Sequence, residues 1–299
     1  MRIVTAPTAA ALRLDDDLVV HGDNAHVLPL LPDAAFDLVY VDPPFNTGSR
    51  RTRRGIVTER DEDGDRTGFG GARYRTRTVG GGWYPDAIDD YPAFIRPRLE
   101  QARRLLAPWG TLYVHLDYRE AHHVKVMLDE VFGRDHFLNE IIWAYDYGAR
   151  TTRRWPAKHD TILVYVRDRS RYHFDAGEVD REPYMAPGLV TPEKAARGKL
   201  PTDVWWHTIV GTSSREKTGY PTQKPEGIVR RIVTASSRPG GWCLDFFAGS
   251  GTLGAVAAGL GRRYVLVDES AEAVAVMRHR LDGGAGVSRP APADDPAGP

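Results

Sequence analysis

A short segment of the chain, VDPPFNTG at residues 41–48, places one acid, two prolines and one aromatic residue directly after an apolar run. The preceding run, FDLVY, has the composition of a buried strand. Pro43 and Pro44 lack a backbone N–H group and have a fixed φ angle, so the chain must leave the sheet in a stiff, extended turn. Asp42 and Phe45 therefore present a carboxylate and a ring at a strand end. By itself, such an acid can also simply cap a turn.

A second segment with ligand-binding chemistry is WCLDFFAGSGTLG, residues 242–254. An apolar run ends in Asp245, a loop with Gly249 and Gly251 follows, and a helical pattern then begins. The next strand-like run ends in Asp268. Glycines let a ligand lie against the backbone, a helix N-terminus offers free N–H groups, and an acid at the next strand tip can accept hydrogen bonds from two ribose hydroxyls. This unit predicts a ligand that contains a nucleoside.

The glycine loop also matches the dinucleotide pattern G-x-G-x-x-G, at residues 249–254. The match alone is weak evidence, and an NAD-dependent oxidoreductase remains an alternative at this point. Two features argue against it. The chain downstream is too short for a second mononucleotide-binding half, and Asp245 would lie beside a pyrophosphate. A carboxylate there suits a cationic ligand better.

The composition is that of a globular protein, with 299 residues, 41% hydrophobic and 27% charged. No apolar run approaches the roughly 20 residues of a membrane helix, and the N-terminus lacks the apolar core of a secretory signal. The single cysteine, Cys243, forms no internal disulfide and suits a reducing cytosol, so a cytoplasmic protein is expected. The 40 basic and 40 acidic residues balance, which excludes an overall basic coat. Residues 49–80 nevertheless carry nine arginines against five acids.

Strand-like and helical patterns alternate along most of the chain, which predicts an α/β fold with a doubly wound, mostly parallel sheet. The strand-like runs are residues 18–20, 36–41, 110–116, 161–166, 242–247 and 262–268. The helical patterns are residues 91–107, 119–133, 224–237, 252–261 and 270–281, the last with Ser270 as a predicted N-cap. Two segments do not fit. Residues 46–90 have no clear period and predict a long mobile loop, and residues 145–220 resemble an insertion.

The two ligand-binding segments occur together in one known family. D-P-P-F after a strand, followed downstream by D-F-F-A-G-S-G, resembles the amino-methylating DNA methyltransferases, which transfer a methyl group from S-adenosylmethionine to N6 of adenine or N4 of cytosine. The catalytic motif comes first here, as in the permuted beta class of that family. Further similar segments are residues 22–48, 139–145, 158–166 and 216–225, so the resemblance covers roughly residues 18–282. The sequence departs from the family pattern at Phe246, where proline is common, and at Phe45, where tyrosine is commoner.

The resemblance implies a methyltransferase fold with an inserted target-recognition region. The expected segments are an N-terminal extension (1–17), a catalytic half (18–145), a target-recognition region (146–215), a cofactor-binding half (216–282) and a disordered tail (283–299). It also implies that Asp42 and the Pro43 carbonyl accept hydrogen bonds from the amino group of a flipped base, with Pro44 stiffening the turn and Phe45 stacking on the base. Aspartate at position 42 favours adenine N6; cytosine N4 is the alternative, because those enzymes more often carry serine there.

The resemblance and the chemistry together predict the residues that bind S-adenosylmethionine. They are Asp23, Asn46, Thr222, Lys224, Asp245, Phe247, Gly249, Ser250, Gly251, Thr252 and Asp268. Asp268 would bind the ribose, Asp245 would face the methionine part, and Asp23 would accept from the cofactor's adenine. Simpler interpretations remain for two of them, a surface lysine for Lys224 and a turn former for Asp23. No metal site is predicted.

Double-stranded DNA is the expected partner, and the arginine-rich segments are the expected contacts. The candidates are Arg50, Arg51, Arg53, Arg54, Arg150, Arg153, Arg154 and Lys158. A homodimer, a companion restriction endonuclease and an inactive DNA-binding protein stay open. Methylation at cytosine C5 is excluded, because it needs a nucleophilic cysteine in a mobile loop and Cys243 lies inside a strand. His115 also lies in an apolar strand and is expected to be a core residue with satisfied polar atoms.

Overall fold

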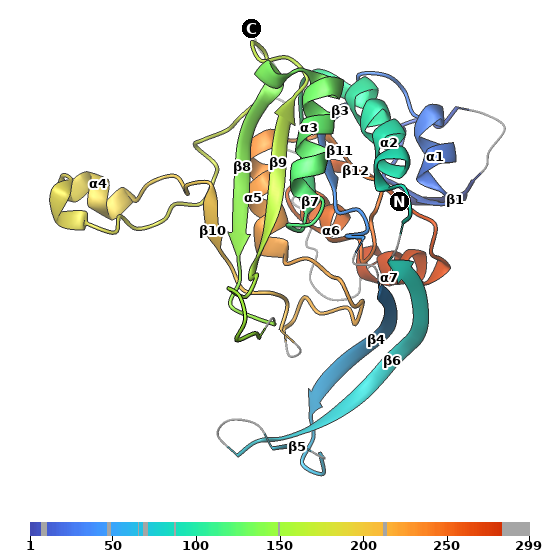
Figure 1. The fold of residues 1–299 in the computed structure, drawn as a ribbon, viewed down its shortest axis with the longest axis vertical. Coiled ribbons are helices and arrows are strands. Elements are labelled where there is room, and N and C mark those ends of the chain that lie inside the picture. Colours follow the sequence, from blue (N-terminus) through green and yellow to red (C-terminus); the bar gives the residue numbers. More distant parts are fainter. Residues whose placement is uncertain are drawn as a thin grey trace, which may run out of the picture.

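A computed structural model describes residues 1–6, 11–46, 49–64, 66–67, 71–86, 88–148, 150–211 and 214–282 (Figure 1). The predicted tail at residues 283–299 lies outside the described residues. So do Thr47 and Gly48, the last two residues of the catalytic segment. Within the described part of the chain, no helix is both long and apolar enough to cross a membrane.

A nine-stranded sheet organises the described residues (Figure 1). Its strands, in spatial order, are β1 (Arg2–Thr5), β2 (Leu18–His21), β12 (Arg263–Asp268), β11 (Trp242–Asp245), β3 (Phe36–Val41), β7 (Leu106–Leu116), β9 (His159–Val166), β8 (Phe137–Ala144) and β10 (Val204–Trp206). Strand β9 runs antiparallel to both of its neighbours, and the other pairs are parallel. The predicted mostly parallel sheet is confirmed.

Helices cover both faces of this sheet, which is the doubly wound arrangement that the sequence predicts. One face carries α1 (Asn24–Val27), η1 (Leu28–Leu30), α2 (Tyr91–Leu105) and α3 (Ala121–Phe132). The other carries α5 (Glu226–Ser236), α6 (Thr252–Gly259) and α7 (Ala271–Leu281). The remaining short helices are η2 (Arg134–His136), η3 (Pro187–Leu189) and α4 (Pro192–Arg197).

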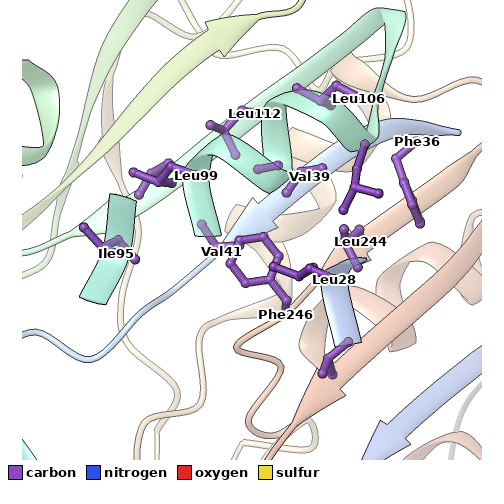
Figure 2. Close-up of a cluster of buried hydrophobic side chains, with 14 of the residues drawn as sticks. Leu28, Phe36, Val39, Val41, Ile95, Leu99, Leu106, Leu112, Leu244 and Phe246 are labelled. Atoms are coloured by element: carbon purple, nitrogen blue, oxygen red, sulfur yellow. The ribbon is translucent and has the colours of Figure 1, made fainter. Parts of the chain in front are cut away.

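Alternate residues of the central strand β3 enter different cores, which explains why its sequence is apolar at consecutive positions. Val39 and Val41 pack with Leu99 of α2 in one core, drawn in Figure 2. Leu38 and Tyr40 enter the other core, against α5 and α6. All six residues of β3 are buried, so the strand and the turn that follows it have a rigid base.

Local signals place most helix ends where the sequence predicts them. Ser270 caps α7, with its side chain accepting a hydrogen bond from the Ala273 N–H at 3.4 Å. Asp90 caps α2 in the same way, accepting from Ala93 N–H at 2.9 Å. Phe246, where the family commonly has proline, is fully buried in the core of Figure 2. That departure therefore supplies packing at the start of the glycine loop.

The prediction of a long loop at residues 46–90 is wrong. Strands β4 (Ser49–Arg60) and β6 (Arg73–Asp86) pair antiparallel and, with β5 (Arg66–Thr67), form a second sheet. This hairpin extends away from the main sheet in Figure 1. Its strands were missed because they alternate arginine, threonine and glycine without the apolar period of a half-buried strand. Backbone pairing and β-prone residues such as Thr52, Val57 and Trp83 favour it instead.

The division of the chain into segments stays a prediction, but two of these segments contribute strands to the main sheet. Strand β9 and strand β10 lie within residues 146–215 and pair in that sheet. The residues between these two strands carry η3 and α4 and extend away from the sheet (Figure 1). The N-terminal extension contributes β1, which pairs with β2 at one edge. Four residues of RIVT were too short a pattern to predict this strand.

Candidate active site

Three acids follow three adjacent parallel strands and therefore gather at one edge of the sheet. Asp42 comes directly after β3, Asp245 ends β11 and Asp268 ends β12, and β11 lies between the other two strands. Ligands of open α/β sheets bind at the carboxyl ends of the strands. The fold thus brings the two ligand-binding segments of the sequence to one place.

Lys224 is the direct partner of Asp42. Its Nζ atom lies 2.9 Å from Asp42 Oδ2, and the side chains are only 12% and 17% exposed, respectively. The same ammonium lies 4.6 Å from the centre of the Phe45 ring, in a cation–π contact. Lys224 is therefore not a surface lysine. In this structure one cation contacts both the acid and the aromatic residue of the catalytic segment.

The segment that delivers Lys224 is folded around Gln223, a buried residue that the sequence analysis did not single out. Its side-chain oxygen accepts from the Thr218 N–H at 2.8 Å, and its amide nitrogen donates to the Glu216 carbonyl at 2.6 Å. The Glu216 carboxylate in turn accepts from the Glu226 N–H at 2.7 Å, at the start of α5. A buried amide inside a polar, turn-forming stretch was the signal that could have found it.

Phe45 is also supported by His115. Their ring centroids lie 6.1 Å apart, tilted by 31°. The His115 side chain is fully buried at the end of β7, and both of its ring nitrogens have partners: Tyr40 Oη at 2.9 Å and Asp160 Oδ2 at 3.1 Å. The expectation that His115 is a satisfied core residue is confirmed.

Hydrogen bonds from backbone N–H groups to the strand-end carboxylates hold the cofactor loop in place. The Asp268 carboxylate accepts from the N–H groups of Gly249 and Ser270, each at 2.8 Å. Asp245 accepts from the Phe247 N–H at 2.9 Å. Gly249 and Gly251 have φ angles of +48° and +71°, which L side chains rarely adopt. The loop therefore needs glycine at both positions.

The Asp245 carboxyl has a pKa well above its ordinary value. Burial is the largest cause, and the carboxylates of Asp42 and Asp268 raise the pKa further, against the opposing Phe247 N–H group and Lys224. Such an accumulation of acids favours a cation. S-adenosylmethionine carries a sulfonium and an ammonium group, so the donor set suits it; a pyrophosphate would be repelled. The oxidoreductase alternative has no support from this charge distribution.

The glycines of the loop also allow close packing against neighbouring side chains. A Cβ atom at Gly251 would lie 2.7 Å from Met277 Cγ, and one at Gly254 would lie 2.6 Å from Leu266 Cδ1. Both glycines thus let the loop and α6 pack tightly on α7 and the sheet. A Cβ atom at Gly249 would press against the Tyr220 ring at 3.2 Å, so this tyrosine also borders the loop.

Several other predicted cofactor residues have structural partners in the structure. Asp23 caps α1, accepting from Ala25 N–H at 2.8 Å, and its carboxylate also contacts Arg98 at 3.3 Å and His26 at 3.9 Å. Asn46 donates to Glu120 Oε1 at 2.9 Å and accepts from the Ile88 N–H at 2.8 Å, with a φ of +51°. These contacts agree with the turn-forming interpretation of Asp23. A role in cofactor binding stays a prediction for both.

The hydroxyl residues of the loop are buried and tied to α7. Arg280, itself 8% exposed, donates to the Ser250 carbonyl and to Thr252 Oγ1, each at 3.1 Å, and to Glu226 Oε1 at 2.6 Å. Arg280 was missed, because a basic residue in a last helical turn usually faces solvent. Thr222 is exposed near Lys224. A role in cofactor binding stays a prediction for Thr222, Ser250 and Thr252.

The predicted DNA contacts fall on two elements. Arg150, Arg153 and Arg154 are exposed on the loop between β8 and β9, and the Lys158 ammonium pairs with Asp146 at 2.6 Å. Since β8 runs in the same direction as β3, this loop begins at the edge of the sheet that carries Asp42. Arg50, Arg51, Arg53 and Arg54 lie along β4 of the hairpin. Trp155, 93% exposed between these basic residues, was not predicted.

Comparisons with known proteins agree with this site. A profile of the N6_N4_Mtase family, described as DNA methylase, matches residues 36–278. The DNA adenine methyltransferase YhdJ of Escherichia coli (strain K12) is 27% identical over 272 residues, which cover 88% of this chain and 82% of that protein.

Two solved structures share the fold. PvuII DNA methyltransferase (cytosine-N4-specific) gives a TM-score of 0.60 at 14% identity, covering 88% of this chain and 85% of that one. The M1.HpyAVI–SAM complex gives 0.57 at 18% identity, covering 88% and 98%. The family match spans most of the chain and includes all three strand-end acids. The chain therefore belongs to the N6/N4 family of S-adenosylmethionine-dependent DNA methyltransferases.

Proposed function

We propose that this chain methylates N6 of adenine at a specific sequence in double-stranded DNA. The observation that carries the choice of adenine is the residue after β3, which is Asp42 and not serine. The relative YhdJ, named as an adenine methyltransferase, supports this choice. Cytosine N4 is the second candidate, since a solved structure with the same fold is described as cytosine-N4-specific.

The chemistry requires two acceptors for one amino group. An exocyclic amino nitrogen is a poor nucleophile, because its lone pair is delocalised into the ring. Asp42 would accept one N–H and the Pro43 carbonyl the other, which orients the lone pair toward the methyl group. S-adenosylmethionine, when bound, supplies that methyl group on a positively charged sulfur. The protein's contribution is positioning and preorganised electrostatics, and the extra proton on nitrogen leaves after transfer.

Phe45 would provide the surface on which the flipped base stacks. A base inside a duplex must be extruded to reach Asp42, at a cost of a few kcal/mol, and stacking on an aromatic side chain recovers about 1–3 kcal/mol. Lys224 contacts both Asp42 and Phe45 in the free chain, so it must move aside. Its ammonium then needs another anion, and the carboxylate of the cofactor's methionine part has the right charge.

The cofactor would lie along the glycine loop. Asp268 would accept from the ribose hydroxyls, Asp245 would face the methionine part, and Phe247 would border the nucleoside. The order of the motifs, with Asp42 before Gly249, supports assignment to the permuted beta class. Asp23, Asn46, Thr222, Ser250, Gly251 and Thr252 complete the predicted set.

The hairpin and the β8–β9 loop would contact DNA. Both carry clustered arginines, and arginine binds phosphates as well as guanine. Replacing residues 50–85 by a short Gly-Ser linker should weaken duplex binding and flatten its dependence on salt concentration, because fewer counterions are released. Unchanged affinity and salt slope would remove the hairpin from the interface.

The test of the proposed function is a map of methylated bases in the genomic DNA of cells that express the chain. We expect N6-methyladenine at a fixed position of a short sequence, and none in cells expressing the variant Asp42→Ala. N4-methylcytosine in place of N6-methyladenine would overturn the base assignment. A genome without either modification, despite soluble protein, would overturn the activity.

A further inference from the structure

A chain of four polar side chains, three of them buried and Tyr145 half-buried, lies behind the base-stacking residue. Tyr40 Oη lies 2.9 Å from His115 Nδ1, His115 Nε2 lies 3.1 Å from Asp160 Oδ2, and the Tyr145 hydroxyl donates to Asp160 Oδ1 at 3.0 Å. Tyr40, His115 and Asp160 are each no more than 6% exposed. Burying polar groups costs free energy, so we expect such a chain at the edge of an apolar core to have a specific role.

The chain crosses four adjacent strands. Tyr40 lies on β3, His115 on β7, Asp160 on β9, and Tyr145 directly follows β8. In the β3–β7 register, Tyr40 pairs with Tyr113 and Val41 with Val114, so His115 is the next residue beside the catalytic segment. The network therefore connects the strands at the level where the catalytic turn leaves the sheet.

Burial and neighbouring groups shift the pKa values of Tyr40 and Asp160. Burial, together with nearby carboxylates, raises the pKa of the Tyr40 phenol well above its ordinary value, so its O–H stays available to donate to His115 Nδ1. Burial alone would raise the pKa of Asp160, but His115, Lys224 and Tyr145 hold it below the ordinary value. Both nitrogens of the His115 ring lie within hydrogen-bonding distance of these two groups. The orientation of the His115 ring is fixed at both nitrogens.

The fixed imidazole has one neighbour that matters for the reaction. Phe45 lies against it, with ring centroids 6.1 Å apart, and the Trp143 ring contacts it edge-on at 5.4 Å. His115 is fully buried, so it supports Phe45 from behind and has no exposed atom for the substrate. We propose that Tyr40, His115, Asp160 and Tyr145 are positioning residues, which hold the Phe45 ring at the height and tilt that the flipped base requires.

The inference rests on the proposed stacking role of Phe45, and a matched pair of tyrosines separates it from a purely structural role. Tyr40→Phe removes the hydroxyl that fixes His115. Tyr113→Phe removes another buried tyrosine hydroxyl, which contacts Ser236 Oγ at 2.8 Å and lies two residues from His115 on the same strand. Both variants lose one buried hydrogen bond, but only Tyr40 belongs to the network behind Phe45.

The experiment is a double-mutant cycle with Phe45→Ala, measured as the single-turnover rate of methyl transfer to a duplex that holds the mapped target site. We expect Tyr40→Phe to slow transfer about tenfold in the wild-type background and less than about twofold in the Phe45→Ala background, with cofactor affinity within about twofold. Tyr113→Phe should lower the melting temperature but slow transfer less than about twofold in either background. Tyr145→Phe serves in place of Tyr40→Phe if that variant does not fold.

Equal slowing by Tyr40→Phe in both backgrounds, or equal slowing by Tyr40→Phe and Tyr113→Phe, would overturn the positioning role. The wild-type chain in the same assay distinguishes this failure from failure of the proposed function. If the wild type methylates adenine while the cycle shows no coupling, only the positioning network is wrong. If the wild type transfers no methyl group to adenine, the proposed function is wrong as well.

Discussion

The acids that end β11 and β12 are held differently from the acid that follows β3. Asp245 and Asp268 accept hydrogen bonds from the backbone N–H groups of Phe247, Gly249 and Ser270, which lie in the loops that follow the two strands. Asp42 is paired instead with the Lys224 side chain, which comes from a distant segment before α5. Both arrangements sit at the same edge of one sheet.

The difference indicates that one part of the site is preformed and that the other is closed by a side chain. Backbone contacts and glycines at positive φ shape the proposed cofactor side without a ligand, so we expect cofactor binding to reorganise little there. The proposed target side is closed by an ion pair and a cation–π contact, which a flipped base would have to replace. Substitutions should accordingly separate cofactor affinity from methyl transfer.

The largest expected effect comes from Asp42→Ala. In the proposed mechanism this removes one of two acceptors for the amino group, which should slow transfer about a hundred- to a thousandfold, as does loss of a preorganised hydrogen-bonding group in other enzymes. The dissociation constant for S-adenosylmethionine, measured by calorimetry, should stay within about threefold. A large loss of cofactor affinity would show that the two sides are not separable.

The reverse pattern is expected from Gly251→Ala. The new Cβ atom would meet Met277 Cγ at 2.7 Å and strain a residue at φ +71°, so the cofactor loop must shift. Cofactor affinity should fall about ten- to a hundredfold, roughly 1.4–2.8 kcal/mol. Gly259→Ala is the matched control, because that glycine lies in open space at the end of α6 and should leave the affinity unchanged.

A smaller effect is expected from Lys224→Met, which opens the ion pair while keeping an apolar stem on Phe45. Cofactor affinity should fall about tenfold, because the variant lacks the ammonium group that would pair with the cofactor's carboxylate. Duplex binding measured without cofactor should become tighter, since Asp42 and Phe45 are then accessible. Lys125→Met is the control: this lysine also pairs with an aspartate, Asp129 at 2.8 Å, and lies 4.2 Å from a phenylalanine ring, but on α3. If both variants behave alike, Lys224 has no special role.

The smallest effect concerns the pH dependence of stability. Because the pKa of Asp245 is raised in the folded chain, the folded state keeps a proton that the unfolded state has lost above the ordinary value of 3.8. The Asp245 contribution to the free energy of unfolding therefore falls as pH rises from that value toward the folded pKa. Asp245→Asn should remove this slope in denaturant titrations across that range.

Asp37 serves as a control, because its contribution to stability should change with pH in the opposite direction. Burial alone would raise its pKa, but hydrogen bonds from Arg238 and Trp109 hold the pKa below the ordinary value. Its contribution is present above the ordinary pKa and is lost as pH falls through the folded pKa. Asp37→Asn should therefore destabilise the chain most at neutral pH. Parallel slopes for the Asp245 and Asp37 variants would contradict the assignment of Asp245 as a protonated, buried acid.

The sequence predicted those parts of the fold whose burial leaves a local pattern. Strand β3 and strand β12 are apolar on both faces, and the glycine loop carries its own conformational signature. The hairpin of β4 and β6 left no apolar period, and was taken for a loop. Strand β9 was recognised, but its place inside the main sheet depends on pairings with β7 and β8 that no local pattern encodes.

In the candidate site, too, the sequence could locate some residues, while the contacts of others depend on the fold. Asp42 and Asp268 stand at strand ends and Gly249 lies in the loop after β11, where residue type and position predict their location. The contact of Lys224 with Asp42 joins segments far apart in the sequence, and the sequence placed this lysine only beside the cofactor. The hydrogen-bond partners of His115, Tyr40 and Asp160, come from two other strands, so their arrangement required the folded sheet.

The most direct test of the account uses purified protein, S-adenosylmethionine with a labelled methyl group, and mixed-sequence duplex DNA that is afterwards digested to nucleosides. The wild-type chain should place the label in N6-methyl-2′-deoxyadenosine, and Asp42→Ala should bind the cofactor but leave the DNA unlabelled. Label in N4-methyl-2′-deoxycytidine, or transfer by Asp42→Ala at the wild-type rate, would contradict the assignment of Asp42 as the acceptor for an adenine amino group.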